Sequence, residues 1–599
     1  YNDEHTGNIT VTTDGDITTA DGVALNAADK VSINSRKGSV ATGGNVTANN
    51  DVDIHAANNI TANGNLTSTN ANVDLLAGGS ITTHGTVNAL NNVISNATGD
   101  IKTNGDVTAT NGNAVLNSST GSVNTQNVTA GQAVDIDAEQ DITAGGNLIS
   151  KNGDITLDAR SGSITTQGTV NAHNNVIANA NGNIATNGDV IAQNGKAQLN
   201  SKGGSITTNG TVNAHDDVIA NANGDINTNG DVTAETGKAV LNSKGGNVNT
   251  GNVKANNEVD IDAANSITAN GNLTSETANV DLLAGGSITT GGEVKAQKNV
   301  DYNAKGSITT KGIINSKAGN IHLQTDAAKG DITFGGDVTA DHGNINIDVL
   351  QNGSVTDHDN KFKALGDKGD INSGNFALQI KGAGDVDLHE IYATNNALID
   401  VANGNLTLAK IDGNLVALQL KTEGKQLKVD ELIAGTKIIA QGSDIDLNKI
   451  QQRLDADGLL TIVPDGAQPD KPIDNLKIGE IITNKGVRFE HLWLNNGSIK
   501  VSEGMFHIDK LVVNNVAHFS NKHMKTVVWG APPQRDGSDS VYWNNIAVNN
   551  PAQNLTEWQQ EGTNPDKWMY LHFTAQPNIQ HSNCLLYTSP SPRDAHESR

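Results

Sequence analysis

The chain has 599 residues, of which only 3% are aromatic, and its formal net charge is −25. So few large rings exclude a wide globular core, and a narrow core of Ile, Val, Leu and Ala is expected instead. The negative charge disfavours binding to nucleic acid or to an anionic membrane surface, because both depend on Lys and Arg. The sequence has no stretch of about eighteen apolar residues, so no membrane span is predicted.

Residues 1–355 carry a regular tandem repeat. Ser205–Gly246 is nearly identical to Ser163–Gly204 at an offset of 42 residues (205 − 163), and each copy divides into two coils of about 21 residues. Each coil begins with an apolar residue after a Gly-containing turn, and apolar and polar residues then alternate, as in β-strands. These anchors are Val40, Ile60, Ile81, Ile101, Val123, Ile142, Ile164, Ile184, Ile206, Ile226, Val248, Ile267, Ile288, Ile308, Ile332 and Val355.

About three short strands fit into each coil, which leaves no room for the helix of a βαβ crossover. The sequence therefore predicts an all-β fold, a parallel β-helix (solenoid) whose coils stack about 4.8 Å apart. Glycine recurs four residues after many anchors, and we expect a positive φ at these corners. Asn often precedes it, as in Asn104-Gly105 and Asn187-Gly188, which predicts ladders of stacked amides.

The pattern loosens over 356–524, which predicts a degenerate β-helix with an insertion near 451–474, where three prolines occur. All five tryptophans lie between Trp493 and Trp568, and residues 525–583 are predicted to form a small Trp-rich module or cap. Residues 584–599 are interpreted as an artefact, because Cys584–Asp594 matches the translation of a transposase sequencing adapter. The start at Tyr1, without a signal segment, predicts a fragment.

Paired aspartates are the first candidates for chemistry. The D-I-D motifs place Asp135 and Asp137, and also Asp260 and Asp262, on the outward face of a strand. Such pairs serve as the acid and base of a glycosidase or as calcium ligands. The motif recurs without sugar-stacking aromatic residues nearby, so a solvated acidic face is the favoured interpretation.

The other candidates are weaker. His84, His173 and His215 are expected on turns or outward rows, without the spacing of a metal site. A Ser-His-Asp triad stays open, because it depends on three-dimensional geometry, but no G-x-S-x-G motif supports it. We therefore predict no catalytic, cofactor-binding or metal-binding residues, no cofactor, and no enzymatic activity.

Two short motifs resemble functional signals but are explained by the repeat itself or by composition. The K-G-D tripeptides Lys329–Asp331 and Lys368–Asp370 resemble integrin ligands, but in this repeat they read as turns that enter a strand. Sequons such as those at Asn45 and Asn65 would allow glycosylation. Asn and Thr are so abundant that chance explains most of these sequons.

The repeat S-I-T-T-x-G-x-V-x-A, over Gly15 to about Met524, resembles that of filamentous haemagglutinin-type adhesins, and more narrowly of leukotoxin-like filamentous adhesins. The resemblance implies a right-handed β-helical stalk that a two-partner-secretion transporter exports across the outer membrane. The secretion domain of that family is not seen in this sequence.

The leading functional hypothesis is a secreted or surface-exposed bacterial adhesin stalk that presents a binding region to host cells or neighbouring cells. Its partners would be the outer-membrane transporter and an unidentified surface receptor, with no nucleic acid and no membrane insertion. The alternatives are the stalk of a contact-dependent toxin or leukotoxin, and a β-helical polysaccharide-degrading enzyme. Near-identical coils argue against the enzyme, because an active site needs coils that differ from the rest.

Overall fold

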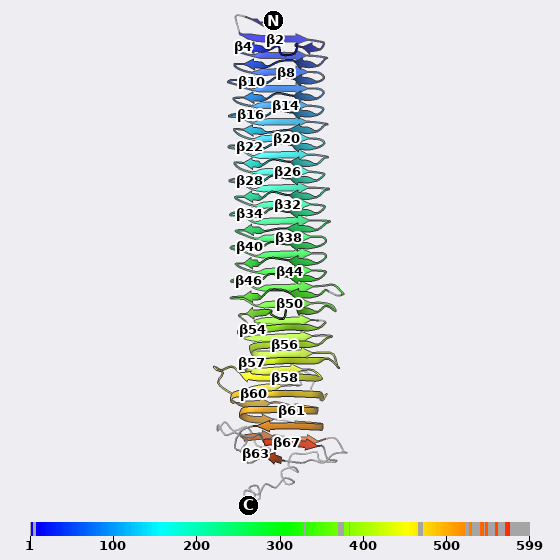
Figure 1. Ribbon diagram of the computed structural model, residues 1–599, viewed down its shortest axis with the longest axis vertical. Helices are drawn as coiled ribbons and strands as arrows, with labels where there is room; N and C mark the ends of the chain where they lie inside the picture. The colour runs from blue at the N-terminus through cyan, green and yellow to red at the C-terminus, as the bar shows by residue number, and fades with distance from the viewer. Residues whose placement is uncertain are drawn as a thin grey trace, which may run out of the picture. The chain divides into compact units, whose positions relative to one another are not determined.

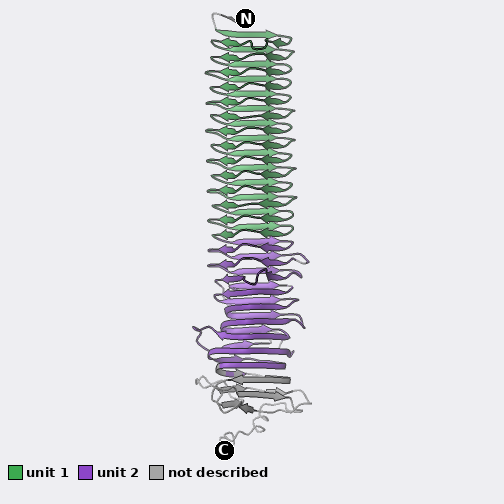
Figure 2. Cartoon of the chain, in the orientation of Figure 1, with its two compact units in different colours: residues 1–297 green, residues 298–599 purple. Residues whose placement is uncertain are grey.

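The computed structural model describes residues 2–3, 7–328, 330–368, 376–382, 384–464 and 471–508. Beyond these it gives only strand backbone, over Leu511–Asn521, Thr526–Trp529, Ser540–Trp543, Ile546–Val548, Trp558–Gln560 and Met569–Thr574. Apart from these strands, the predicted Trp-rich module (525–583) and the tail (584–599) lie outside the described residues. The described chain is all β, without a helix, and divides into unit 1 (1–297) and unit 2 (298–599) (Figure 2).

Unit 1 is a parallel β-solenoid with about 21 residues per coil (Figure 1). One coil consists of β24 (Ile164–Thr166), β25 (Val170–Ala172) and β26 (Val176–Ala180). The next coil repeats these lengths in β27 (Ile184–Thr186), β28 (Val190–Ala192) and β29 (Ala197–Ser201), and each strand pairs in parallel with its counterpart. The same lengths recur from β6 (Val40–Thr42) to β43 (Val294–Ala296).

The core follows the predicted alternation. Strands of three residues have buried first and third positions, and strands of five residues have buried first, third and fifth positions. Ile164, Val170 and Val176 are therefore almost completely buried, and each stacks on its equivalent in the next coil. All sixteen predicted anchors are the first residue of a strand, which confirms the coil boundaries. Each coil thus contributes a thin layer of Ile, Val, Leu and Ala to one continuous narrow core.

The corner glycines have a different role from the predicted one. None of the eight glycines four residues after an anchor has a positive φ, so that expectation was wrong. A Cβ at any of them would lie 2.3–2.5 Å from an atom of the preceding coil; at Gly210, for example, it would meet the carbonyl carbon of Gly188 at 2.5 Å. Glycine is needed because two backbones approach closely at these corners, a requirement that is independent of φ. The glycines concerned are Gly64, Gly85, Gly105, Gly168, Gly188, Gly210, Gly230 and Gly271.

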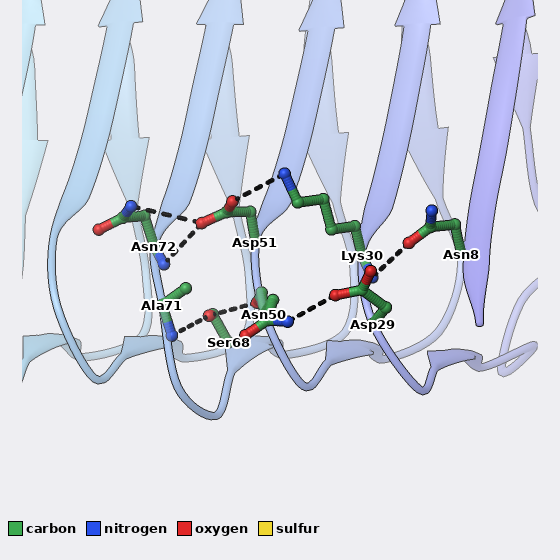
Figure 3. Close-up of polar contacts among 8 residues, drawn as sticks. All are labelled: Asn8, Asp29, Lys30, Asn50, Asp51, Ser68, Ala71 and Asn72. Atoms are coloured by element: carbon green, nitrogen blue, oxygen red, sulfur yellow. Dashed lines mark hydrogen bonds and ion pairs between the residues drawn. The ribbon is translucent and has the colours of Figure 1, made fainter. Parts of the chain in front are cut away.

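Polar residues directly before the strands connect successive coils (Figure 3). Asn8 Oδ1 accepts a hydrogen bond from Lys30 N at 3.0 Å, and Asp51 Oδ1 accepts one from Asn72 N at 3.2 Å. Lys30 Nζ also lies 3.3 Å from Asp51 Oδ2, one coil further along. Each such acceptor receives a backbone N–H of the next coil, which explains why Asn, Asp and Ser recur at this position.

The predicted amide ladder is confirmed in the middle of unit 1. Asn187 Nδ2 donates to Gln167 Oε1 at 2.7 Å, and Asn209 Nδ2 donates to Asn187 Oδ1 at 2.6 Å. Asn229 Nδ2 continues the series to Asn209 Oδ1 at 2.7 Å. The four side chains come from successive coils, and the two middle amides, Asn187 and Asn209, both donate and accept along the stacking direction.

Unit 2 keeps the same coil at first and then lengthens its strands. Strands from β44 (Val300–Ala304) to β51 (Val355–Asp357) have three or five residues, whereas β56 (Leu406–Leu420) and β57 (Gln426–Gln441) have 15 and 16. Larger side chains fill the core, and the ring centroids of the stacked Phe334 and Phe362 lie 4.5 Å apart. Inside the predicted insertion, β59 (Leu460–Val463) pairs with β57 and with β60 (Ile473–Phe489), so part of that segment is a strand of the coil.

Candidate functional site

The outward face of the five-residue strands carries the predicted aspartates. Asp135 and Asp137 lie at the second and fourth positions of β20 (Val134–Ala138), and both are half-buried. Asp260 and Asp262 occupy the same positions on β38 (Val259–Ala263). Because their neighbours in these strands fill the core, the carboxylates face outward in two rows that run along the stacked coils.

The register of the sheet stacks like charges on these rows. Asp137 lies opposite Asp158, and Asp260 lies opposite Asp281. Burial, and then the charges of Asp262 and Glu258, raise the pKa of Asp260 to about 6. Burial likewise raises the pKa of Asp137, with Asp135 and Asp158 adding to the shift. Charged carboxylates at these positions therefore oppose the fold.

A third acidic position was not recognised from the sequence. Asp53 on β8 (Val52–Ala56) lies opposite Asp74 on β11 (Val73–Ala77). Burial raises the pKa of both carboxyls, and Asp51 adds to the shift at each. The signal was present in the sequence, since V-D-I and V-D-L occur one coil apart there. Three acidic groups thus recur on one face of unit 1, at intervals of several coils.

These rows do not assemble into a recognisable catalytic centre. Among the described residues, no group of three or more His, Cys, Asp or Glu side chains is placed to hold a metal ion. The aspartates lie on the outer face of the sheet, and their partners in register are also aspartates. A general acid–base pair instead needs two carboxyl groups held in different environments around a substrate. The structure shows rows of half-buried carboxylates on an outward face.

The predicted histidines lie at turns and contact the following coil. His84 Nδ1 is 3.0 Å from Asn104 Nδ2, and His173 Nε2 is 3.3 Å from Asn194 Nδ2. His215 Nδ1 lies 3.5 Å from a carboxylate oxygen of Glu235. Each histidine thus has a partner in the coil stack, and the structure does not bring the three together.

Of the remaining sequence motifs, the sequons at Asn45 and Asn65 lie in the described part of the chain, whereas the K-G-D tripeptides and Cys584 do not lie fully within it. Asn45 Oδ1 accepts from Asn65 N at 2.8 Å, and Asn65 Oδ1 accepts from Thr86 N at 2.9 Å, so both sequon asparagines serve the coil-to-coil hydrogen bonds. Both K-G-D tripeptides include residues outside the described part of the chain. Cys584 also lies outside it.

Unit 2 contains a charged histidine that sequence reasoning missed. His322 on β47 (Ile321–Thr325) lies between Asp301 on β44 and Asp348 on β50 (Ile345–Val349). Its Nδ1 is 3.3 Å from Asp301 Oδ1, and its Nε2 is 3.2 Å from Asp348 Oδ2. Hydrogen bonds to Asp301 and then to Asp348 raise the pKa of His322 to about 9. The imidazolium therefore ties three coils together at neutral pH.

A row of alternating charge follows the longer strands of unit 2. In register, Lys363 lies opposite Glu390, Glu390 opposite Lys410, Lys410 opposite Glu431, and Glu431 opposite Lys449. Lys363 Nζ is 3.6 Å from Glu390, and Lys410 Nζ is 3.9 Å from Glu431. Opposite charges directly across from one another stabilise a parallel pair.

Tyr392 and Arg453 border this row. The Tyr392 hydroxyl donates to Glu390 Oε2 at 2.6 Å, while burial and then that carboxylate raise the pKa of Tyr392 to about 12. Arg453 Nε donates to Asp412 Oδ1 at 2.8 Å, and its terminal nitrogens donate to the carbonyls of Ala393 and Thr394. These contacts engage the Tyr392 hydroxyl and the Arg453 guanidinium, and they give both side chains a structural role.

Comparisons with protein family models, with curated proteins and with solved structures found no match. No helix in the described part of the chain is long and apolar enough to cross a membrane.

Proposed function

We propose that the chain is part of a filamentous adhesin stalk on a bacterial cell surface, and that it acts by presenting a binding region to host cells or neighbouring cells. The observation that supports this most is the near identity of the coils of unit 1, which keep the same strand lengths and burial pattern from β6 to β43. A fold that repeats one coil with few changes suits spacing better than chemistry.

The surface chemistry of unit 1 is consistent with that role. Its outward rows carry Asp, Asn and Thr, which keep a long repetitive surface hydrated and negatively charged. The resemblance to filamentous haemagglutinin-type adhesins extends the proposal to export by an outer-membrane transporter of the two-partner type and to an unidentified receptor. In this proposal the chain is secreted or held at the cell surface and is not an enzyme.

Attachment of beads coated with the purified chain tests the proposal. Coated beads are expected to adhere to cultured epithelial cells or to bacterial cells well above beads coated with albumin. The same incubations report on the alternatives. Lysis of the target cells would favour a toxin stalk, and release of reducing ends from acidic polysaccharides would favour an enzyme. Attachment no better than that of albumin beads would contradict the adhesin proposal.

A further inference from the structure

The five-residue strands of unit 1 form one face of the coil, and Figure 1 labels β20, β26, β32 (Val218–Ala222) and β38 along it. Each of these strands pairs in parallel with the next five-residue strand, from β20 to β41 (Val280–Ala284). Their second and fourth positions face outward, and neither Lys nor Arg occupies such a position in these strands. The outward face is therefore built from apolar, uncharged polar and acidic side chains.

Three aliphatic side chains, which we call the apolar band, lie on this face. Ile177, Ile219 and Val240 occupy the second positions of β26, β32 and β35 (Ala239–Ser243), and each is partly exposed. Ile219 lies directly opposite Val240, and Gln198 on β29 separates Ile219 from Ile177. Single exposed aliphatic residues are common on proteins, whereas a run of them in register forms an apolar surface that marks a site of interaction.

A row of amides borders the apolar band at the fourth positions. Asn200 Nδ2 donates to Asn179 Oδ1 at 2.9 Å, and Asn221 Nδ2 donates to Asn200 Oδ1 at 3.1 Å. Because these amides bond to one another along the stack, they form a fixed border of short side chains beside the aliphatic residues. The apolar band therefore stays accessible to a partner that lies along the stack.

Carboxylates lie at both ends of the apolar band. Asp158 on β23 (Ile155–Ala159) and Asp262 on β38 continue the row of the asparagines and are five coils apart, which is about 24 Å. Among the described residues, neither carboxylate takes part in an ion pair or a hydrogen bond. Asp137 and Asp260 add negative charge at the same two ends.

The cations near these ends do not neutralise them. Arg160 Nε pairs with Glu139 at 3.1 Å, so its charge is already matched. Lys238 acts on Asp260 from the turn before β35, but burial and the charges of Asp262 and Glu258 outweigh it, so the pKa of Asp260 stays raised. A partner with a cation at each end would supply the missing opposite charge.

The size of the face favours a peptide over a second copy of the chain. A five-residue strand is about 17 Å long, so the face between Asp158 and Asp262 covers about 400 Å², half of the ~800 Å² per partner in a stable protein interface. A second copy would have to extend over the carboxylates at both ends and bring like charges together. One α-helix, about 10 Å wide and about 16 residues long, matches the width and length of the face.

We propose that this face binds a cationic amphipathic peptide segment that lies along the stack. The apolar side chains of the segment cover the apolar band, and Lys or Arg at its two ends meet Asp158 and Asp262. Burial of aliphatic surface supplies most of the affinity, and the separation of the two acidic ends fixes the position of the segment. This inference goes beyond the stalk proposal and does not rest on it, because binding is measured on the purified chain.

Fluorescence anisotropy with the purified chain and a labelled helical peptide tests the proposal. The peptide has about 16 residues, with Leu on one face of its middle turns and Lys at both ends. The matched control peptide has the same composition, with Lys in the middle and Leu at the ends. The first peptide is expected to bind at least about tenfold more tightly, and its affinity should fall as salt screens the ends. Equal affinity of the two peptides would overturn the proposal, because only nonspecific charge attraction would remain.

Ile219→Gln is expected to weaken binding of the first peptide about tenfold, since an aliphatic contact is lost. Gln198 already occupies the equivalent position of the preceding coil, so the substitution suits the fold. Ile191→Gln is the matched control: Ile191 is also partly exposed, but it lies on β28, outside this face, and its loss should leave binding unchanged. Asp158→Asn and Asp262→Asn should each weaken binding about threefold.

Chemical denaturation of each variant verifies that its coils remain folded. Wild-type binding by Ile219→Gln, or an equal loss of binding in Ile191→Gln, would overturn the proposal. Sedimentation that shows dimers of the chain which Ile219→Gln abolishes would also overturn it, because a second copy would then occupy the face.

Discussion

Neighbouring coils of unit 1 place Asp260 opposite Asp281, whereas neighbouring coils of unit 2 place Glu390 opposite Lys410. In unit 1 the charges of the aspartate rows oppose the stack, and ion pairs between coils, such as that of Lys30 with Asp51, lie outside these rows. In unit 2, rows of opposite charge and the His322 imidazolium connect neighbouring coils. The two units thus differ in whether neighbouring coils place like or opposite charges along these rows.

The two units also differ in where a ligand could bind. Unit 1 repeats its turns closely, and stacked glycines and amides fill the corners. Unit 2 varies the length of its turns, and one corner borders an open pocket of about 220 Å³. Regularity suits a spacer, and departure from regularity creates room for a specific site. The predictions below test whether each unit depends on the forces assigned to it.

The largest effect is expected at the corners of unit 1. Gly210→Ala would place a Cβ 2.5 Å from the backbone of the preceding coil and should lower the free energy of unfolding by about 3 kcal/mol. Gly251→Ala is the control, because its nearest neighbour would be 3.7 Å away. Chemical denaturation of both variants gives the comparison. Equal stability of the two would mean that close coil contact does not explain the corner glycines.

His322→Gln should destabilise the chain by an amount that depends on pH, because the ion pairs of unit 2 need a charged imidazole. The pKa of His322 is raised to about 9, above its unfolded value, so its contribution is complete below about pH 6.5 and is lost as the pH rises through 9. After discounting for partial exposure, we expect the variant to be about 2 kcal/mol less stable at pH 6. Thermal melts at pH 6 and pH 10 should show this difference shrink. A difference that does not change with pH would exclude the ion pairs as its cause.

Asp260→Asn should raise the free energy of unfolding at neutral pH, whereas His322→Gln lowers it. The raised pKa of Asp260, about 6, means that its charged form penalises the folded state, so stability rises as the pH falls from about 6 to below 4. Removing the charge should stabilise the chain by about 1 kcal/mol at pH 7 after allowance for solvent screening. The gain should disappear at pH 3.5 in parallel melts. Destabilisation at pH 7 would show that this carboxylate has a favourable partner.

The smallest effect is expected inside unit 1. Thr208 is buried and its hydroxyl has no hydrogen-bond partner, whereas the Thr228 and Thr250 hydroxyls lie 2.5 Å apart. Thr208→Val should raise the free energy of unfolding by roughly 0.5–1 kcal/mol, because a buried unsatisfied group is replaced by a methyl group of similar size. Thr250→Val loses a hydrogen bond and should be destabilising. The same sign for both substitutions would contradict this assignment.

The fold was largely predictable because a stacked coil forces its sequence to repeat. Anchors such as Ile164 and Ile206 mark the strand starts directly, and the N-G pairs predict the amide ladder at Asn187. The role of Gly210 was misjudged because a requirement for positive φ and a requirement for close approach both select glycine. Only the position of the preceding coil separates the two.

The candidate sites were less predictable, because their partners lie one or two coils apart. Asp301, His322 and Asp348 belong to three different strands; the first step is 21 residues but the second is 26, so no regular spacing connects them.

The most direct test of the stacked-coil account is a distance measured within unit 1. Spin labels at Asn117→Cys and Leu283→Cys, with Cys584 replaced by Ser, would lie on outward positions of strands eight coils apart. At about 4.8 Å per coil the backbone separation is about 38 Å, and deletion of residues 205–246, which removes two coils, should shorten it to about 29 Å. An unchanged or broadly distributed distance after the deletion would contradict the account.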